Sequence, residues 1–417
     1  MPHDEAGSTS SPAAVTWRAD EVRRLLEFGT PSVRTDAGAA WLDGSGRPDG
    51  TRPVHTWITA RMAHTYALGD LLGVPRCAER ADRALAGLTG ALRDTQHGGW
   101  FASYGPGDAV DGTKAAYAHA FVVLAAASAT QAGRPGAENL LAEALEVLDR
   151  RFWEAGPGML ADEWDRTWSA MAPYRGINAN MHGVEALLAA SDATGDPRWR
   201  ERAAAVVDRT SAWAAANDWR IPEHFTVGWS PDLEFNADRP RDPFKPYGST
   251  PGHGFEWARL MLQLDVASGE VGRRTDAAQQ LFERALADGF DGTGFVYTVD
   301  WAGDPVERRR FHWVAAEAVA TAEVLATVTG SAEYADHAAQ WWELVRDRFV
   351  DAERGSWHHE LDAEDRPAGE VWDGKPDIYH AVQALLVPDL PLTGSFAESA
   401  RRAGSLGAQP PASPVSR

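Results

Sequence analysis

Imidazole and carboxylate side chains stand near the starts of several segments that otherwise hold small and apolar residues. His253 and Glu256 are three residues apart after a Pro-Gly pair, and His380 follows the run Lys-Pro-Asp-Ile-Tyr. Residues three or four apart share one face of a helix, so we expect Glu256 to orient the ring of His253 and to raise its basicity. A histidine with a pKa near neutrality can act as a general base. The spacing therefore predicts proton-transfer chemistry at the first turns of two helices.

Two further segments carry polar side chains at helical spacing. Trp57, Arg61 and His64 are four and three residues apart, and Asn178 and His182 are four apart. Each set therefore falls on one helical face, and we expect both faces to contribute to one site. The alternative is structural: Arg61 would extend its charge towards water along an apolar surface, and His64 would make an internal contact.

Other polar residues in such segments have more ordinary explanations. Glu317 lies in an Ala-rich stretch, where a lone buried carboxylate would be costly. We expect Arg61 or a ligand to compensate its charge. His119 is interpreted as a core histidine, and Glu185 as mainly structural.

The polar residues fall in six apolar segments that recur about every sixty residues, a spacing typical of repeat architectures. These segments are near Trp57–Leu72, Lys114–Thr130, Asn178–Asp192, Gly252–Ser268, Phe311–Thr329 and Pro376–Val387. Amphipathic segments alternate with them near Ala19–Phe28, Pro75–Arg93, Ala137–Phe152, Pro197–Ala214, Arg274–Ala287 and Ala332–Phe349. In the second set, apolar residues three and four apart indicate helices with one face in water. Twelve alternating helices predict an all-α (α/α)6 barrel whose inner helices surround one shared pocket.

The chain is expected to form a single domain between two tails. Short Gly- and aromatic-rich turns follow the amphipathic helices, as in His97-Gly-Gly-Trp-Phe101, and glycine suits turns with positive φ. We expect the catalytic domain to cover residues 15–390. Residues 1–14 and 391–417 are predicted to be disordered, because they are rich in Ser, Pro and Gly.

Composition excludes several classes of protein. The 417 residues are 44% hydrophobic and carry a formal net charge of −20, which repels nucleic acid and anionic membranes. Cys77 is the one cysteine, so no disulfide can form within the chain. With no long apolar run and no secretory pattern, we expect a cytoplasmic protein. The 18 tryptophans give weak support to a carbohydrate pocket, since indole rings stack on sugars.

A metal site and a hydrolytic site are two further interpretations of these residues. His182, His253, Glu256 and His380 could ligate zinc or manganese, but the sequence has no His-Glu-x-x-His motif. The pair His358-His359 is expected at the surface. Glycoside hydrolysis would need two carboxylates flanking one bond, whereas the inner segments carry mostly histidines. We therefore predict no metal and no cofactor.

Several motifs together resemble the N-acylglucosamine 2-epimerase superfamily. They are Arg61-Met-x-His64-x-Tyr66, Asn178-x-Asn180-Met-His182, Gly252-His253-x-x-Glu256-Trp257, Trp313-x-x-x-Glu317 and Lys375-Pro-Asp-Ile-Tyr379-His380. The resemblance covers residues 17–390, and the first and last motifs look most like the aldose–ketose isomerase branch of mannose and sulfoquinovose isomerases. It implies an (α/α)6 barrel and metal-independent sugar chemistry.

The resemblance also implies roles for individual residues. His380 would move a proton between C2 and C1 of the sugar, and His253, oriented by Glu256, would open the pyranose ring. Arg61 and His182 would hold the oxygens of the enediolate intermediate. The expected substrate-binding residues are Trp57, His64, Asn178, Trp313, Glu317, Tyr379 and Gln383.

The substrate is expected to be an uncharged monosaccharide, with mannose and fructose as the first choice. Sulfoquinovose is an alternative if the basic loop Arg239–Lys245 supplies a sulfonate pocket. Epimerisation at C2, of mannose or of cellobiose, is a further alternative, because His253 could serve as a second base. An (α/α)6 glycoside hydrolase or lyase, and a non-catalytic binding partner, are the alternatives from other classes. We expect a monomer or a weak homo-oligomer.

Overall fold

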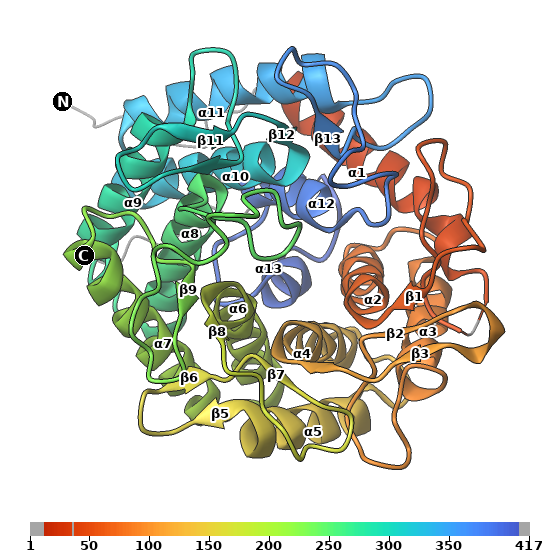
Figure 1. Ribbon diagram of the computed structural model, residues 1–417. Coiled ribbons are helices and arrows are strands. Elements are labelled where there is room, and N and C mark those ends of the chain that lie inside the picture. Colours follow the sequence, from red (N-terminus) through yellow and green to blue (C-terminus); the bar gives the residue numbers. More distant parts are fainter. Residues whose placement is uncertain (1–11, 36, 408–417) are drawn as a thin grey trace.

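An inner ring of six helices defines the architecture (Figure 1). The computed structural model describes residues 12–35 and 37–407. The inner helices are α2 (Thr56–Leu71), α4 (Ala116–Gln131), α6 (Ile177–Thr194), α8 (Pro251–Ser268), α10 (His312–Thr329) and α12 (Tyr379–Leu386). Each contacts the next, and α12 contacts α2, so the ring is closed.

Six outer helices surround the ring and alternate with the inner helices along the chain. They are α1 (Pro12–Phe28), α3 (Cys77–Thr89), α5 (Ala137–Val147), α7 (Pro197–Ala216), α9 (Thr275–Gly289) and α11 (Ala332–Leu344). Helix α5 buries Leu140, Leu141 and Leu145 while its acidic face stays in water, whereas the Ala-rich α4 is buried almost throughout. An inner helix is apolar all round because both of its sides are covered. The prediction of an (α/α)6 barrel is confirmed.

Short strands and helical turns connect the helices. The strands are β1 (Val54–His55), β2 (Ser103–Tyr104), β3 (Val110–Asp111), β4 (Lys114–Ala115), β5 (Trp153–Glu154), β6 (Met159–Leu160), β7 (Glu163–Trp164), β8 (Arg175–Gly176), β9 (His224–Phe225), β10 (Thr298–Val299), β11 (Pro305–Glu307), β12 (Arg310–Phe311) and β13 (Glu360–Leu361). The 3-10 turns are η1 (Thr30–Val33), η2 (Pro106–Asp108) and η5 (Val387–Asp389), and the π-helical turns η3 (Leu148–Phe152) and η4 (Val345–Phe349) extend α5 and α11.

The strand pairs hold the beginnings of the inner helices at one end of the barrel. The strand before each of four inner helices pairs with a strand that follows the next outer helix: β1 with β2, β4 with β7, β8 with β9, and β12 with β13. The first amide of α6, at Ile177, donates to the carbonyl of Glu223 at 3.0 Å. Such bonds satisfy N–H groups that a helix start leaves free. Side chains in the first turns are therefore gathered at the same end.

The structure corrects two predicted boundaries. The last inner helix begins at Tyr379 rather than at Pro376, because the Asp377 carboxylate accepts the Tyr379 amide at 3.0 Å in a non-helical turn. The predicted C-terminal tail is wrong for residues 391–407, which include helix α13 (Phe396–Ala403). At the other end, α1 already begins at Pro12. The remaining tail residues, 1–11 and 408–417, lie outside the described residues.

Helix α13 closes the barrel at the end opposite the first turns. It lies near the centre of the ring (Figure 1) and contacts α2, α4 and α6. Ser395 donates to Asp192 near the end of α6 at 2.7 Å, and the Arg259 guanidinium lies 5.4 Å from the centre of the Phe396 ring. The Ser- and Gly-rich sequence before α13 did not predict a helix here. The helix is stabilised by its burial against the barrel rather than by its local sequence.

No helix among the described residues is both long enough and apolar enough to cross a membrane.

Replacement of Phe396 tests the closure by α13. Because this ring is buried, we expect Phe396→Ala to lower the free energy of unfolding by about 3–5 kcal/mol. Denaturant unfolding followed by circular dichroism measures the change. Arg401→Ala, on the exposed face of the same helix, should change it by less than about 0.5 kcal/mol. Equal effects of the two substitutions would show that α13 does not seal the barrel.

Candidate active site

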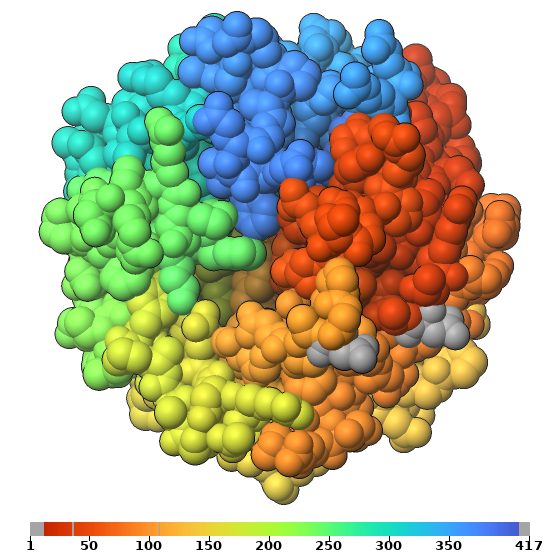
Figure 2. Space-filling view, turned by 45° about the vertical axis from the view of Figure 1, so that its right-hand side comes forward, coloured from red at the N-terminus to blue at the C-terminus, as the bar shows by residue number. Residues whose placement is uncertain are grey.

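A cavity opens at the end of the barrel where the inner helices begin. The empty space within it is about 730 Å³ when the open solvent at its mouth is counted, and its lining combines aromatic rings with a few polar groups, as in small-ligand sites. Figure 2 shows a hollow near the middle of this face, where segments from the two halves of the chain meet. All six inner helices contribute to its lining. The lining residues are Trp57, Arg61, Tyr117, Asn178, His182, Pro243, Phe244, Pro246, His253, Glu256, Tyr297, Phe311, His312, Trp313, His359, Trp372, Pro376, Asp377 and His380.

His380 is held as a neutral imidazole by its surroundings. Its Nδ1 lies 2.8 Å from Oε1 of Glu317, so Nδ1–H donates to the carboxylate and Nε2 keeps a lone pair. Burial, the nearby Arg61 charge and two neighbouring histidines hold the pKa of His380 well below 6.5. The ring is thus prepared to accept a proton at Nε2.

His253 has a different carboxylate partner from the one expected. Its Nδ1 lies 2.9 Å from Oε2 of Glu223, and the other Glu223 oxygen accepts the Thr250 amide at 3.2 Å. The prediction that Glu256 orients His253 is wrong, because Glu256 is turned towards α6 and Arg259 instead. Sequence reasoning missed Glu223, which lies 30 residues away along the chain. The available signal was a carboxylate within the run Ile-Pro-Glu-His-Phe.

The two histidines flank one aromatic side chain. The Trp313 ring centre is 5.3 Å from the His253 ring and 5.8 Å from the His380 ring. The side chains of His253 and His380 are 12% and 6% exposed. They therefore meet in one sheltered space, although 127 positions separate them in the sequence (380 minus 253).

The guanidinium of Arg61 lines the cavity and is packed between aromatic rings. It lies 4.9 Å from the Trp57 ring centre and 4.7 Å from that of Tyr379, and it pairs with the Asp377 carboxylate at 3.2 Å. It also donates to the Tyr117 hydroxyl at 2.9 Å. Stacking of this kind stabilises a buried guanidinium, and its Nε has no hydrogen-bond partner among the described residues. A ligand oxygen could accept from that atom.

The expected ion pair between Arg61 and Glu317 is absent from the described residues. Arg259 of α8 pairs with Glu317 of α10 instead, at 2.9 Å between Nη2 and Oε2. The physical reason is adjacency, because α8 and α10 pack side by side in the ring, whereas Arg61 lies next to Asp377 before α12.

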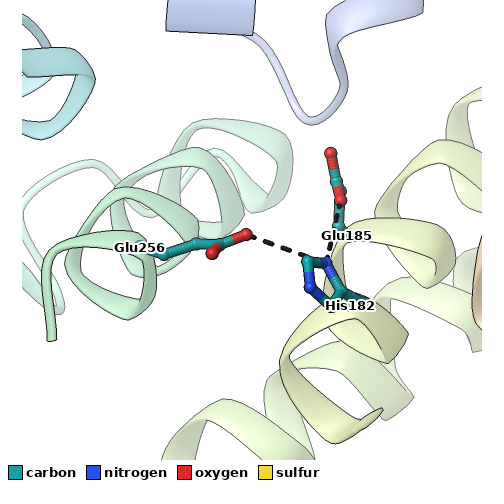
Figure 3. Close-up of side chains that lie close together, drawn as sticks. All are labelled: His182, Glu185 and Glu256. Carbon is teal, nitrogen blue, oxygen red and sulfur yellow. Dashed lines mark ion pairs between the residues drawn. The ribbon is translucent and has the colours of Figure 1, made fainter. Parts of the chain in front are cut away.

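His182 and Glu256, which line the cavity, form a buried cluster with Glu185, which lies beneath the lining. Figure 3 shows how His182 faces both Glu185, at 3.6 Å, and Glu256, at 3.7 Å. Donor atoms of this trio lie close enough to share a metal ion. However, Nη2 of Arg259 is 3.6 Å from Oε1 of Glu256 and already supplies positive charge there. That charge disfavours a second cation.

Four predicted substrate-binding residues lie beneath the cavity rather than in its lining. They are His64, Glu317, Tyr379 and Gln383. Gln383 donates to Glu185 at 2.7 Å and lies 3.2 Å from Nε2 of His64, while the Tyr379 hydroxyl donates to Glu185. The expectation of direct contact is therefore corrected: these side chains support the residues above them. Helical spacing predicted that these four side chains face the inside of the barrel. It did not predict how far each lies from the cavity along the barrel axis.

Trp57, Asn178 and Trp313, three of the predicted substrate-binding residues, lie in the cavity lining. His359, which the sequence analysis placed at the surface, also lies in the cavity lining. It is buried, stacks on His312 with ring centres 4.0 Å apart, and lies 3.1 Å from the Asp377 carbonyl oxygen. The expected surface pair is wrong for His359, because the strand pair β12–β13 turns this side chain inwards.

The loop Arg239–Lys245 turns its basic side chains away from the cavity. Arg241 pairs with Glu307 at 2.8 Å, Lys245 pairs with Glu163 at 3.1 Å, and Arg239 donates to Asn236 at 2.7 Å. The loop instead presents Phe244 to the cavity. It forms an apolar wall and not an anion pocket.

His119 is a buried core residue, as predicted, and its Nε2 accepts the Trp100 amide at 3.1 Å.

Aromatic rings surround the cavity mouth. The Phe244 ring is 5.0 Å from the Trp372 ring and 6.3 Å from the Trp57 ring. Such rings suit the C–H faces of a sugar.

The fold and the cavity together define a class: an (α/α)6-barrel protein with paired histidines in an aromatic pocket. A family comparison agrees, since the model of N-acylglucosamine 2-epimerase (GlcNAc 2-epimerase) matches residues 38–384. The chain belongs to this family.

Within this family, the chain is similar to proteins named D-mannose isomerase. The chain is 48% identical to a D-mannose isomerase of Thermobifida fusca over 93% of this chain and 97% of that protein. It is 44% identical to a D-mannose isomerase of Pseudomonas cannabina pv. alisalensis over 93% and 96%. A crystal structure of D-mannose isomerase superposes with a TM-score of 0.83 at 27% identity, covering 91% of this chain and 99% of the other.

Replacement of Glu223 tests whether its carboxylate supports the function of His253 through the hydrogen bond to Nδ1. We expect Glu223→Gln to lower kcat/KM about 10- to 100-fold, because the amide can fix the ring but lacks the charge that supports its protonated form. Steady-state kinetics across pH measures the loss. Glu234→Gln, at an exposed position of the following loop, should leave the rate unchanged. A normal rate and pH profile for Glu223→Gln would contradict the assigned partnership.

Proposed function

We propose that this protein is an aldose–ketose isomerase that interconverts D-mannose and D-fructose through a cis-enediolate. The observation that carries the proposal is the pair of histidines, each bonded through Nδ1 to a carboxylate, on either side of Trp313. The identity of 44–48% to two D-mannose isomerases supports the choice of sugar.

Ring opening is assigned to His253. The imidazole takes the proton from the O1 hydroxyl and returns a proton to the ring oxygen as the C1–O5 bond breaks, which leaves an aldehyde at C1. Glu223 supports the imidazolium that forms between these two transfers. The partial exposure of His253 allows exchange of its proton with water.

Proton transfer between carbons is assigned to His380. Nε2 removes the proton from C2, the C–H electrons form the C1–C2 double bond, and the carbonyl electrons move onto O1. A proton then passes between O2 and O1, and the imidazolium returns its proton to C1 to give the ketose. Arg61 and His182 hold the oxygen atoms that carry the negative charge.

The charge of the lining favours a neutral sugar. Among the described lining residues, Arg61 is the only lysine or arginine, and Asp377 already pairs with it. A sulfonate or phosphate would be left without a dedicated cation. Sulfoquinovose is therefore the less favoured substrate. Epimerisation at C2 remains compatible as a side reaction, because His253 could return the proton to the opposite face.

Mannose supplied in deuterium oxide tests the reaction. We expect fructose that carries deuterium at C1 in only part of the molecules, because one base that moves a proton between carbons shields it partly from solvent. His380→Ala should lower kcat about 1,000-fold or more, whereas His337→Ala on the outer helix α11 should not. Nuclear magnetic resonance of the product measures both quantities. Fructose formation at the normal rate by His380→Ala would refute the assignment.

We also propose that the reaction needs no metal ion, because Arg61 and Arg259 supply the positive charge near the carboxylates. Prolonged dialysis against EDTA should leave turnover of mannose unchanged. Loss of activity that manganese restores would show that a cation, and not a guanidinium, balances the site.

A further inference from the structure

Glu256 is a fully buried carboxyl group in the wall of the cavity, and neither of its oxygens has a hydrogen-bond partner among the described residues. Two basic side chains lie within 4 Å of its oxygens: Nη2 of Arg259 at 3.6 Å and Nδ1 of His182 at 3.7 Å. A carboxylate that is both ionised and unbonded would be very costly at such a depth. The residue must therefore be compensated by a cation or carry a proton.

The neighbouring cations are shared with, or paired to, other carboxylates. Arg259 donates from Nε to Oε2 of Glu317 at 3.0 Å, whereas its Nη2, 2.9 Å from the same oxygen, has no hydrogen-bond partner among the described residues. One guanidinium thus carries a single positive charge between two carboxylates, Glu317 and Glu256. Arg61 pairs with Asp377, and Glu185 is held by neutral donors, the Tyr379 hydroxyl and the Gln383 amide. The cluster thus contains more carboxylates than free positive charges.

The histidines near Glu256 do not supply the missing charge. Burial lowers the pKa of His182 to about 4, and His380 is likewise held neutral. Tyr117 of α4 is neutral, because burial raises its pKa to about 12. Glu317 and Glu185, on α10 and α6, add negative charge that opposes ionisation of Glu256.

We propose that Glu256 holds a proton in the resting enzyme and donates a hydrogen bond from its neutral carboxyl group to an enediolate oxygen of the bound sugar. The proposal rests on the proposed function for the identity of the acceptor. No covalent bond is made or broken at Glu256, and the proton is on its carboxyl group at the start and at the end of each turnover. Burial, followed by the charge of Glu317, raises the pKa of Glu256 well above its usual value.

A neutral donor suits the chemistry of this intermediate better than a carboxylate. An enediolate carries negative charge that an ionised Glu256 would repel at contact distance. A carboxylic acid kept neutral in an apolar site stabilises such an oxyanion by donation. Glu256 would then complement Arg61, whose Nε is the other donor without a partner.

Two substitutions distinguish a neutral Glu256 that donates a hydrogen bond from an ionised Glu256 that acts as a base. Glu256→Gln keeps a neutral donor of the same shape, so we expect kcat within about tenfold of the parent protein. Glu256→Ala removes the donor and should lower kcat about 100- to 1,000-fold. The fall in kcat at high pH that accompanies ionisation of Glu256 should be missing in Glu256→Gln. Equal, severe losses in both variants would overturn the proposal.

Infrared spectroscopy provides a readout that needs no substrate. The difference spectrum of the parent protein minus Glu256→Gln at neutral pH should contain the carbonyl band of a protonated carboxyl group. A titration of the parent protein alone repeats the measurement if that variant does not fold: a buried carboxyl band should persist at neutral pH and vanish only in alkali. Asp162→Asn removes the signal of Asp162, whose pKa burial raises to about 7.

The outcomes distinguish the two proposals. A protonated band without mannose turnover would refute the assigned substrate and leave the protonation of Glu256 standing. Absence of the band would overturn the inference, because it requires an ionised Glu256.

Discussion

The ion pair between Arg259 and Glu317 is the interaction on which the site depends. It joins α8 to α10 in the centre of the barrel, where neither side chain is more than 2% exposed. The second oxygen of Glu317 fixes His380 on α12, so one carboxylate links three inner helices. Buried charges of this kind are costly unless each is paired. The arrangement therefore contributes less to stability than to the definition of a single geometry.

Burial lowers the pKa of three histidines around the cavity. His182, His312 and His380 lie among apolar side chains and guanidinium charges, which lower their pKa values. Neutral imidazoles can accept protons, and the ring of His253 is oriented by the Glu223 carboxylate. The same low dielectric strengthens the hydrogen bonds that support an anionic intermediate. Two histidines can thus perform different tasks within one pocket.

Much of the fold was predictable because its signals are local. The alternation of amphipathic and wholly apolar helices, and the glycines in the turns between them, predicted twelve helices and a closed ring. The errors fell where tertiary contacts outweigh local preference. Helix α13 forms because Phe396 packs into the barrel, and the last inner helix starts late because Asp377 caps a turn through the Tyr379 amide. Neither contact leaves a periodic pattern in the sequence.

Helical periodicity alone indicates which residues face inwards, since it places His182, His253 and His380 on the inner faces of their helices. The partners of these residues depend on how the helices pack. Glu223 rather than Glu256 bonds His253, Arg259 rather than Arg61 compensates Glu317, and His359 is drawn inside by the pairing of β12 with β13. The physical reason is that hydrogen bonds act over about 3 Å, while the helices that carry the partners are set side by side by packing across the whole ring.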